Sequence, residues 1–345
     1  PDGSPNGFDI KRLKPKLGTV GVPTGEVTLD GARAWLAGGN SETADQSAAR
    51  DGRGINRMME MVNSSRFGVA LMGLGIHRRS FLEAAIYAAH RTQWGQRIDR
   101  YPLVRETLVD LLVDLEAGMS ITFECAGALR GAAEPDEARL VRRILIPLAK
   151  MRSTRVALWA ASNALEIFGG NGYMHDWPIA RQLRDAQCHT IWEGTENILA
   201  IDVRRSIRGE QAHLALAKRI DRALEAGSGH RSLDAARDIV ATTRRGAWEV
   251  IDAMADAPED EALLKSRRLA ELLADTSEAA LLLEEAAWSL DHDGDARKAA
   301  IARRFVSRRL ADAPLRGLLV DDRTVLDHFE PLIRYGAIDP GALAA

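Results

Sequence analysis

The segment Ile191-Trp192-Glu193-Gly194-Thr195-Glu196-Asn197-Ile198 sets a carboxylate between a bulky aromatic side chain and a glycine. The aromatic ring shields Glu193 from water, and Gly194 lets a ligand approach the backbone closely. A shielded carboxylate suits the role of a general base. The same residues also fit an ordinary helix N-terminus, in which Thr195 caps the helix and the helix dipole stabilises the acid. Taken alone, the segment is compatible with both interpretations.

The composition of the 345-residue chain favours helices packed on helices. Hydrophobic residues make up 46% and aromatic residues only 5%, a profile that suits a helical core better than a sheet-rich one. The formal net charge of -3 gives no global attraction to nucleic acid or to an anionic membrane. No apolar run reaches membrane-spanning length, and no signal peptide is visible. We expect a soluble, cytoplasmic, mostly helical protein with no membrane partner.

The cysteines and histidines do not suggest a metal site. Cys125 and Cys188 have neither metal-ligand spacing nor a disulfide framework, which indicates a reducing compartment. Four histidines without acidic or cysteine partners at ligand spacing are expected to be surface or core residues: His77, His90, His175 and His189. We therefore predict no bound metal.

Three long helices are predicted in the centre of the chain, where apolar residues recur at helical intervals. They cover residues 55–91, 102–131 and 135–168, with a bend expected at Pro147. Long helices joined by short connections form a bundle. Three glycines inside the first helix each cost about 1 kcal/mol relative to Ala, so we expect another helix or a ligand to approach closely at Gly68, Gly73 and Gly75.

Strand signals are confined to residues 8–40. Residues 16–19 lead to residues 25–31, an alternating pattern bounded by glycines. One or two strands are not stable alone, so they need a sheet that is mostly absent from this sequence. Residues 40–54 are polar and are predicted to be a loop. Because the chain begins at Pro1 without a Met, we expect it to be a fragment of a larger protein.

Residues 210–345 are predicted to be a separate helical region, broken at residues 227–229 and containing about five shorter helices. Six basic residues recur there at a spacing that gives one helix a basic face. Such a face is usually solvated, but it could also bind phosphates. The six residues are Arg297, Lys298, Arg303, Arg304, Arg308 and Arg309.

Four short motifs follow one another along the chain: Arg-Thr-Gln-Trp-Gly at residues 91–95, Glu-Ile-Phe-Gly-Gly-Asn-Gly-Tyr at 166–173, Arg-Asp-Ala at 184–186 and Trp-Glu-Gly-Thr at 192–195. In order and spacing they resemble the Arg-x-x-Phe-Gly, Gln-x-x-Gly-Gly-x-Gly, Arg-Asp-Ala and Tyr-Glu-Gly-Thr motifs of the acyl-CoA dehydrogenase family. The resemblance covers residues 8–208. It implies an all-α fold in three parts: the end of a middle β-domain at residues 1–40, the C-terminal four-helix-bundle domain at 41–209 and a helical extension at 210–345.

The resemblance implies FAD-dependent α,β-dehydrogenation of an acyl-CoA thioester. Glu193 matches the family's base, which removes the α-proton while a hydride leaves the β-carbon for flavin N5. The Glu193 backbone N–H would polarise the thioester carbonyl, and Gly194 would leave room for the acyl chain. The family's alternative base position is Ser65 here, so Glu193 has no rival. Arg66 would shape the mouth of the substrate pocket, although a simple salt bridge explains it equally well.

The resemblance also assigns residues to FAD. Arg91 matches the arginine that reaches the diphosphate, often from a neighbouring subunit, since its planar fork pairs bidentately with phosphate. Alternatively, Arg91 complements a helix dipole and the double glycine is a helix C-cap. Gln93 and Trp94 would line the adenosine end of the cofactor. The remaining implied cofactor contacts are Gly169, Gly170, Trp192, Thr195, Asn197 and Glu166, where Glu166 stands in place of the family's amide.

Trp192, Glu166 and the long helical tail are similar to the alkylation-response, AidB-like branch of the family. The implied partners are an electron-transferring flavoprotein and further copies of the chain, as a dimer of dimers. The alternative function is a DNA-associated flavoprotein with weak or vestigial dehydrogenase activity, in which the extension binds DNA. Because one side of the family's cofactor site is absent from this sequence, we expect this fragment to bind FAD weakly or not at all.

Overall fold

The computed structural model describes residues 6–34, 54–129, 135–312 and 322–343. The chain divides into two compact units, residues 1–65 and residues 66–345, which are described separately. The described residues form ten α-helices and two small antiparallel pairs of strands, so the predicted mostly helical fold is confirmed. Most of the predicted loop at residues 40–54 lies outside the described residues, and Gly54 begins helix α1 (Gly54–His90).

The first unit contains a β-hairpin of β1 (Phe8–Leu13) and β2 (Gly25–Leu29), in which Phe8 pairs with Leu29. The prediction of strand structure at residues 16–19 is wrong, because those residues form the connecting turn. Lys16 Nζ donates to the Thr19 carbonyl at 2.7 Å and closes this turn. Apolar side chains of both strands are exposed, and a hairpin that buries no apolar face is only marginally stable by itself.

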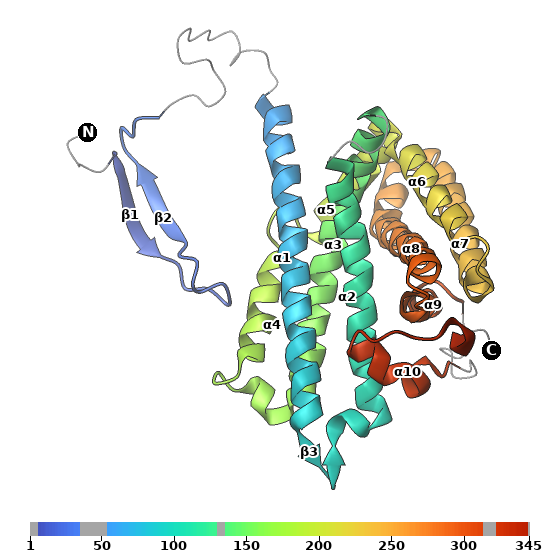
Figure 1. Cartoon of the computed structure of the whole chain (residues 1–345). Coiled ribbons are helices and arrows are strands. Elements are labelled where there is room, and N and C mark those ends of the chain that lie inside the picture. The colour runs from blue at the N-terminus through green and yellow to red at the C-terminus, as the bar shows by residue number, and fades with distance from the viewer. Residues whose placement is uncertain (1–5, 35–53, 130–134, 313–321, 344–345) are drawn as a thin grey trace. The chain divides into compact units, whose positions relative to one another are not determined.

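Three long helices form the framework of the second unit. From Arg66 onward, α1 lies beside α2 (Pro102–Leu129) and α3 (Pro135–Phe168) (Figure 1). Both α2 and α3 begin at a proline, whose fixed φ and missing N–H suit the first position of a helix. Pro147 lies inside α3. The three predicted long helices are thereby confirmed, each ending within about two residues of its predicted limit or where the description stops.

Close helix packing explains one of the three glycines inside α1. A Cβ on Gly73 would lie 3.2 Å from the backbone carbonyl carbon of Ser153 on α3, so a methyl group there would require the two helices to move slightly apart. Gly118 on α2 is similar, since its Cβ would lie 2.9 Å from Leu74. At Gly68 and Gly75 no described protein atom lies within 4 Å of an added Cβ, so no helix approaches closely there, and the approach of a ligand stays a prediction.

Short elements link the long helices and carry the sequence motifs. They are, in chain order, β3 (Thr92–Gln93), β4 (Gln96–Arg97), the 3-10 turns η1 (Ile98–Arg100) and η2 (Gly169–Tyr173), α4 (Pro178–His189) and α5 (Glu196–Glu210). Strands β3 and β4 form a tight hairpin between α1 and α2. Helix α4 connects η2 to the Trp-Glu-Gly-Thr motif.

The C-terminal helices pack directly on the bundle. They are α6 (Ala212–Ala226), α7 (Asp234–Ala255), α8 (Glu259–His292), α9 (Arg297–Arg309) and α10 (Thr324–Ile333), joined by the 3-10 turn η3 (Arg231–Leu233) and followed by η5 (Pro340–Leu343). Helix α8 contacts α2, α3 and α5, and one hydrophobic core runs through all of these helices. The expectation that all tail helices are short is wrong for α8, which has 34 residues. Its first turn carries three acids that stabilise a helix N-terminus.

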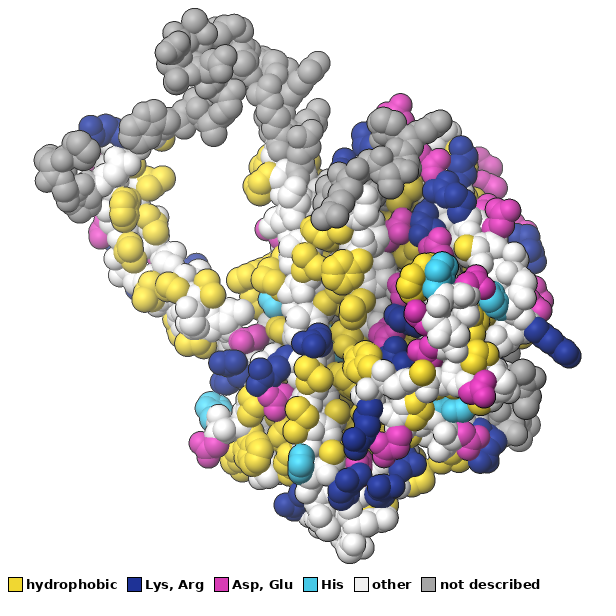
Figure 2. All heavy atoms as spheres, in the orientation of Figure 1, with side chains coloured by type: hydrophobic (Ala, Val, Ile, Leu, Met, Phe, Trp, Pro, Cys, Tyr) yellow, Lys and Arg dark blue, Asp and Glu magenta, His cyan; other side chains and the backbone are white. Residues whose placement is uncertain are grey.

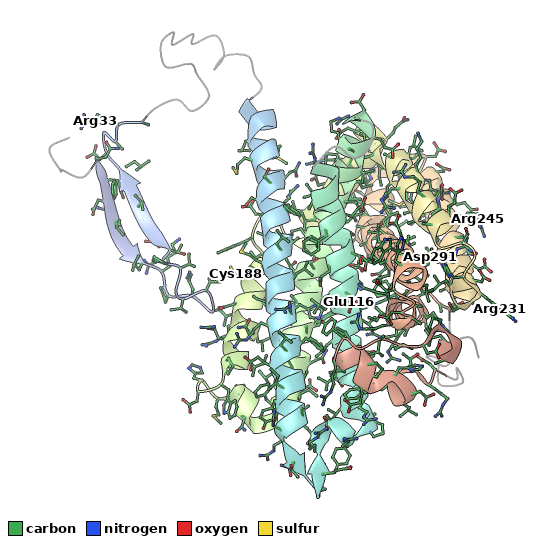
Figure 3. All side chains as sticks on the ribbon, in the orientation of Figure 1. Arg33, Glu116, Cys188, Arg231, Arg245 and Asp291 are labelled. Atoms are coloured by element: carbon green, nitrogen blue, oxygen red, sulfur yellow. The ribbon has the colours of Figure 1, made fainter. Side chains whose placement is uncertain are left out.

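The predicted basic face lies on α9, and five of its six residues pair with acids of α2, while Arg303 and Arg308 are also exposed to solvent. The acids of α2 thus neutralise five of the six charges of this face. On the face shown in Figure 2, basic and acidic side chains are interspersed over the C-terminal helices, and Figure 3 labels Glu116 where α2 meets them. The ion pairs are Arg297 and Lys298 with Glu116, Arg304 with Asp110, and Arg308 and Arg309 with Asp114, while Arg303 donates to the Leu343 carbonyl.

Candidate active site

Glu193 lies in the short loop between α4 and α5, in a conformation that L-residues rarely adopt. Its φ is 56°, in the left-handed region, and the φ of Gly194 is 105°. A left-handed φ in a non-glycine residue costs about 1–2 kcal/mol, and it persists only when the surroundings enforce it. The side chain of Glu193 is half-buried. A strained residue that carries a half-buried carboxylate marks this loop as a candidate functional site.

Two buried cations hold the backbone of this loop. Arg66 Nε, on α1, donates to the Glu193 carbonyl at 3.1 Å. Lys150 Nζ, on α3, donates to the Gly194 carbonyl at 2.6 Å. Arg66 is 4% exposed and Lys150 is fully buried. The two bonds join consecutive peptide groups of the loop to two different helices of the bundle.

Arg66 belongs to a chain of ion pairs that is buried at Arg66 and Asp202 and reaches the surface at Glu210. Its Nη1 lies 2.5 Å from Asp202 on α5, and the other oxygen of Asp202 lies 2.8 Å from Arg143 Nη2 on α3. Arg143 Nε in turn pairs with Glu210 at 2.8 Å. Arg66 therefore does form a salt bridge, as one of the two interpretations predicted, and its guanidinium also donates to the Glu193 carbonyl. A role of Arg66 at the mouth of the substrate pocket stays a prediction.

The environment of Lys150 disfavours its charged form. Desolvation lowers the pKa of Lys150 to about 8, and the charge of Arg66 acts in the same direction, while Glu196 and Glu193 oppose it. Nearby, desolvation also lowers the pKa of His189. The ring of His189 lies 6.2 Å from that of Trp192, edge to face, so His189 supports the aromatic neighbour of Glu193.

Exposed apolar side chains flank Glu193 in the sequence. Ile191 is 57%, Trp192 39% and Ile198 52% exposed. Thr195 occupies the N-cap position of α5, but its side chain makes no capping hydrogen bond, so the expected capping role is not seen. Thr195 and Asn197 are exposed on the same short segment. A half-buried carboxylate with exposed apolar neighbours is a suitable surface for an apolar ligand.

The predicted diphosphate contacts lie at the β3–β4 hairpin. Arg91 is exposed there, and Trp94 at the hairpin turn is 88% exposed with φ 47°. The Gln93 side-chain amide, oriented with its oxygen toward Arg91, accepts a hydrogen bond from Arg91 Nε at 3.2 Å. Trp94 stacks edge to face on Tyr101, with ring centroids 5.9 Å apart. An exposed guanidinium beside an exposed aromatic ring can bind a phosphate and a base.

The glycine turn η2 is fixed to the end of α1 that carries this hairpin. Asn171 Nδ2 donates to the Tyr87 hydroxyl at 3.1 Å, and the Tyr87 ring stacks on Phe168 at 4.2 Å. Tyr87 is one helical turn before Arg91, whose N–H donates to the Tyr87 carbonyl. Nothing lies within 4 Å of an added Cβ at Gly169 or Gly170, so their backbone is open to a ligand. Glu166 is exposed close by in sequence.

Gly172, in contrast, is required by packing. A Cβ there would lie 2.5 Å from the Leu165 carbonyl oxygen and 3.0 Å from Phe168 Cβ. We predict that Gly172→Ala lowers the free energy of unfolding by about 1–3 kcal/mol because the turn must move to accept the methyl group. Urea denaturation measures this loss. Gly170→Ala is the matched control, with a change below about 1 kcal/mol; equal losses in both variants would contradict the packing assignment.

The two groups of predicted residues lie at opposite ends of α4. Arg91, Gln93, Trp94, Gly169 and Gly170 are at the end where α4 begins, and the Glu193 loop follows its last turn. Twelve helical residues span about 18 Å. The structure thus brings the predicted site residues together as two clusters rather than one.

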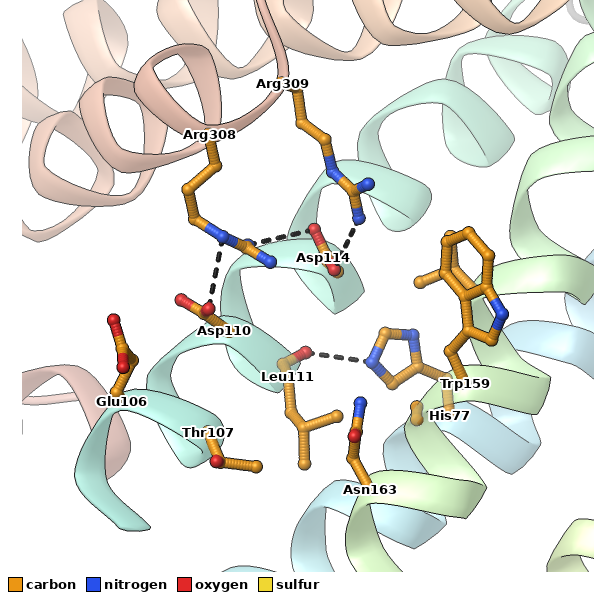
Figure 4. A pocket seen from close by; sticks show the side chains of 12 residues that line it. His77, Glu106, Thr107, Asp110, Leu111, Asp114, Trp159, Asn163, Arg308 and Arg309 are labelled. Atoms are coloured by element: carbon orange, nitrogen blue, oxygen red, sulfur yellow. Dashed lines mark hydrogen bonds and ion pairs between the residues drawn. The ribbon is translucent and has the colours of Figure 1, made fainter. Parts of the chain in front are cut away.

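A cavity of about 350 Å³ lies away from both clusters, between α2, α3 and α9 (Figure 4). Figure 4 shows Arg308 and Arg309 bound to Asp110 and Asp114 at its wall, so its charges are already paired. None of the predicted site residues lines it. The buried ring of His77 faces it and binds the Leu111 carbonyl at 2.9 Å.

His77 makes the fold sensitive to acid. Burial lowers the pKa of His77 to about 4, so the folded state keeps this ring neutral where an unfolded chain protonates it. Its contribution is complete above pH 6.5 and is lost as the pH falls toward 4, by up to about 3 kcal/mol. We predict that between these pH values the wild type loses this much more unfolding free energy than His77→Gln in urea titrations. Parallel pH profiles of the two proteins would contradict the prediction.

Several residues of the Glu193 cluster were not identified from the sequence. Lys150 stands alone in the apolar stretch Leu148-Ala149-Lys150-Met151, and Asp202 lies on the buried face of α5. A single charged residue within an apolar helical stretch indicates a buried charge, and a buried charge needs a polar partner. The sequence does not show which partner it has.

The structure shows no metal site or membrane span in the part of the chain that it describes. No three His, Cys, Asp or Glu side chains within the described ranges are grouped as metal ligands. Cys125 is buried and Cys188 partly buried, both as free thiols. No described helix is long and apolar enough to cross a bilayer.

Comparison with known proteins identifies the part of the chain that carries the candidate site. Residues 52–208 match the family model for the acyl-CoA dehydrogenase C-terminal domain. Acyl-CoA dehydrogenase family member 11 of Caenorhabditis elegans is 37% identical over 226 residues, which cover 64% of this chain and 35% of that protein. Putative acyl-CoA dehydrogenase AidB of Escherichia coli is 32% identical over 205 residues, covering 59% of this chain and 36% of that protein. The chain thus spans about a third of the length of these relatives.

Solved structures extend the similarity to the C-terminal helices. The crystal structure of Caenorhabditis elegans ACDH-11 in complex with C11-CoA covers 94% of this chain and 55% of that chain, with a TM-score of 0.80 and 29% identity. Acyl-CoA dehydrogenase of Bacillus anthracis complexed with FAD covers 98% of this chain, with a TM-score of 0.72 and 18% identity, and shows the fold alone. Residues 52–208 therefore match an acyl-CoA dehydrogenase C-terminal domain, and the chain is similar to members of that family over this part of its length.

Proposed function

We propose that this chain supplies the catalytic base and part of the cofactor site for α,β-dehydrogenation of an acyl-CoA thioester. The observation that carries the proposal is the Glu193 loop. Its half-buried carboxylate belongs to a residue with a left-handed conformation, Arg66 and Lys150 bind the loop backbone, and the neighbouring residues in sequence are exposed and apolar. In this proposal Glu193 removes the α-proton of the substrate. A fixed carboxylate within reach of that proton is the first requirement of a general base.

The neighbours of Glu193 have separate roles in this proposal. The backbone N–H of Glu193 binds the thioester oxygen, which stabilises the charge that develops there. Gly194 keeps space for the acyl chain, since a Cβ at this position would meet Ile198 at 3.4 Å and would be strained at a φ of 105°. Ile191, Trp192 and Ile198 exclude water from the reacting atoms.

The chain's residues fit FAD in two parts. Arg91, with Gln93, Trp94 and the open backbone of Gly169 and Gly170, would hold the diphosphate and adenosine end. By the resemblance, Thr195 and Asn197 would contact the adenine half of the cofactor, and Trp192 would be a further contact. Bound FAD supplies the acceptor for the hydride. Because α4 separates the two clusters, we propose that Arg91 and its neighbours serve the cofactor of another copy of the chain, within a homo-oligomer.

We further propose an acyl-CoA as substrate and an electron-transferring flavoprotein as electron acceptor. The complex of ACDH-11 with C11-CoA supports the substrate class. The similarity to AidB at 32% identity supports a place near the AidB-like branch, but acyl-CoA dehydrogenase family member 11 is more similar, at 37% identity. DNA binding through the extension is not proposed, because five of the six basic residues of α9 that motivated it are paired with acids of α2.

Anaerobic flavin reduction tests the proposal. The protein is expressed from its complete reading frame, loaded with FAD and mixed with a panel of saturated acyl-CoAs of different chain length. We expect at least one of them to bleach the visible flavin band. If no member of the panel bleaches a protein that holds FAD, the proposed reaction is wrong.

A further inference from the structure

Lys150 and Arg66 together fix the direction of two consecutive peptide groups. Their hydrogen bonds turn the Glu193 and Gly194 carbonyls into the protein. In a trans peptide the N–H of the following residue points the opposite way. The N–H groups of Gly194 and Thr195 are therefore turned away from the two cations. The orientation of this strained segment is set by the bundle and not by the loop alone.

Lys150 restrains a part of the loop backbone that Arg66 does not bind. Arg66 binds the carbonyl of Glu193 itself, but the next residue is a glycine, whose backbone can adopt many conformations at little cost. The bond from Lys150 Nζ to the Gly194 carbonyl removes this freedom. Since α5 begins two residues later, at Glu196, the loop is then fixed on both sides of Gly194.

Within the described part of the chain, Lys150 is buried without an ion pair that would offset the free-energy cost of burying its charge. Its side chain is fully buried. Among the described residues its one hydrogen bond is to the Gly194 carbonyl, and no carboxylate lies within 4.0 Å of its ammonium. The charged groups that act on it are Arg66 on α1, Arg155 on α3, and Glu193 and Glu196 at the loop and the start of α5. A buried charge without a carboxylate partner costs folding free energy.

We propose that Lys150 is a positioning residue, which fixes the direction of the Glu193 carboxylate by holding the Gly194 carbonyl. The inference rests on the proposed function of Glu193 as the base. It predicts that loss of the ammonium loosens residues 192–195 and slows proton removal, while binding of cofactor and substrate persists. A residue needed only for packing would instead change stability and binding together.

Lys150→Met separates these two cases, because Met fills much of the same volume without a donor or charge. In the 345-residue chain we expect amide hydrogen exchange to rise about 10-fold or more in residues 192–195 and to stay unchanged elsewhere, with an equal or higher urea midpoint. In the FAD-loaded protein we expect the rate constant of flavin reduction at saturating acyl-CoA to fall by about 10- to 100-fold. The Kd for acyl-CoA should stay within about 3-fold.

Two further variants complete the test. Lys218→Met, at an exposed position of α6, should match the wild type in every measurement. Lys150→Gln keeps a donor and should lose less than Lys150→Met in both exchange and rate. Unchanged exchange at residues 192–195 in Lys150→Met would overturn the inference, and so would a wild-type reduction rate. If the wild type itself is reduced by no acyl-CoA, the proposed function fails, whereas the exchange comparison still decides whether Lys150 holds the loop.

Discussion

Glu193→Gln should lower the rate of flavin reduction by acyl-CoA by about 100- to 10,000-fold. Gln has nearly the same shape but cannot accept the α-proton, so binding should persist while chemistry stops. Because Arg66 and Lys150 bind the backbone at this loop, the substitution leaves their hydrogen bonds in place. Anaerobic stopped-flow measurement of the visible flavin band gives the rate, and titration with acyl-CoA gives the Kd. We expect a large fall in rate with little change in Kd.

Glu196→Gln is the matched control, with the same chemical change three residues later. Glu196 accepts two hydrogen bonds of 2.8 Å from Arg155, and a Gln there can keep one of them. We expect its reduction rate to stay within a few-fold of the wild type, at about the same Kd. If Glu193→Gln and Glu196→Gln are reduced equally fast, Glu193 is not the base.

Arg152→Met should remove about 3–5 kcal/mol of unfolding free energy at neutral pH. Arg152 lies on α3, 7% exposed, and is the described cation nearest to two acids of α8: Asp275 at 2.9 Å and Glu278 at 3.6 Å. Without it, the two carboxyl groups remain in the junction between the bundle and the extension with no cation within 4.0 Å among the described residues. Desolvation raises the pKa of both Asp275 and Glu278. The loss should therefore grow as the pH rises and both acids ionise.

Urea denaturation at pH 6 and pH 9 measures the size and the pH dependence of this effect. Arg267→Met is the control, since Arg267 pairs with Glu271 on α8 while both are about half exposed, and such pairs contribute less than about 1 kcal/mol. A triple variant that also replaces Asp275 by Leu and Glu278 by Met should recover most of the stability, because no buried charge is left unpaired. A loss in Arg152→Met as small as that in Arg267→Met would show that the two acids are not held by Arg152.

The periodic parts of the fold could be predicted from the sequence because helices follow local rules. Apolar residues at helical intervals, with prolines at the helix starts, located α1, α2 and α3 closely. Residues 16–19 were misassigned because their alternating pattern is short, and a side chain, Lys16, closes a turn there. The length of α8 was not predicted, because a run of residues with high helix propensity does not show where one helix ends and the next begins.

The partners of the charged residues, in contrast, could not be predicted from the sequence. From spacing alone, the face of α9 with Arg304, Arg308 and Arg309 is a solvated or phosphate-binding surface. In the structure these side chains meet Asp110 and Asp114 of α2, about 190 residues away in sequence. Periodicity reports that residues share a helix face, but it does not report what lies opposite that face.

The sequence by itself determined the helical bundle, the resemblance of residues 52–208 to an acyl-CoA dehydrogenase domain and the position of the carboxylate at residue 193, because periodicity and short motifs are local properties of the chain. Only the tertiary structure decided how that carboxylate is held. The left-handed φ of Glu193 and its two anchors, Arg66 and Lys150, depend on helices that are 127 and 44 residues away along the chain. Such contacts form only when the core brings distant helices together. Burial then makes an unpaired charge costly in free energy, and this cost favours the one arrangement in which each charged group has a hydrogen-bond partner.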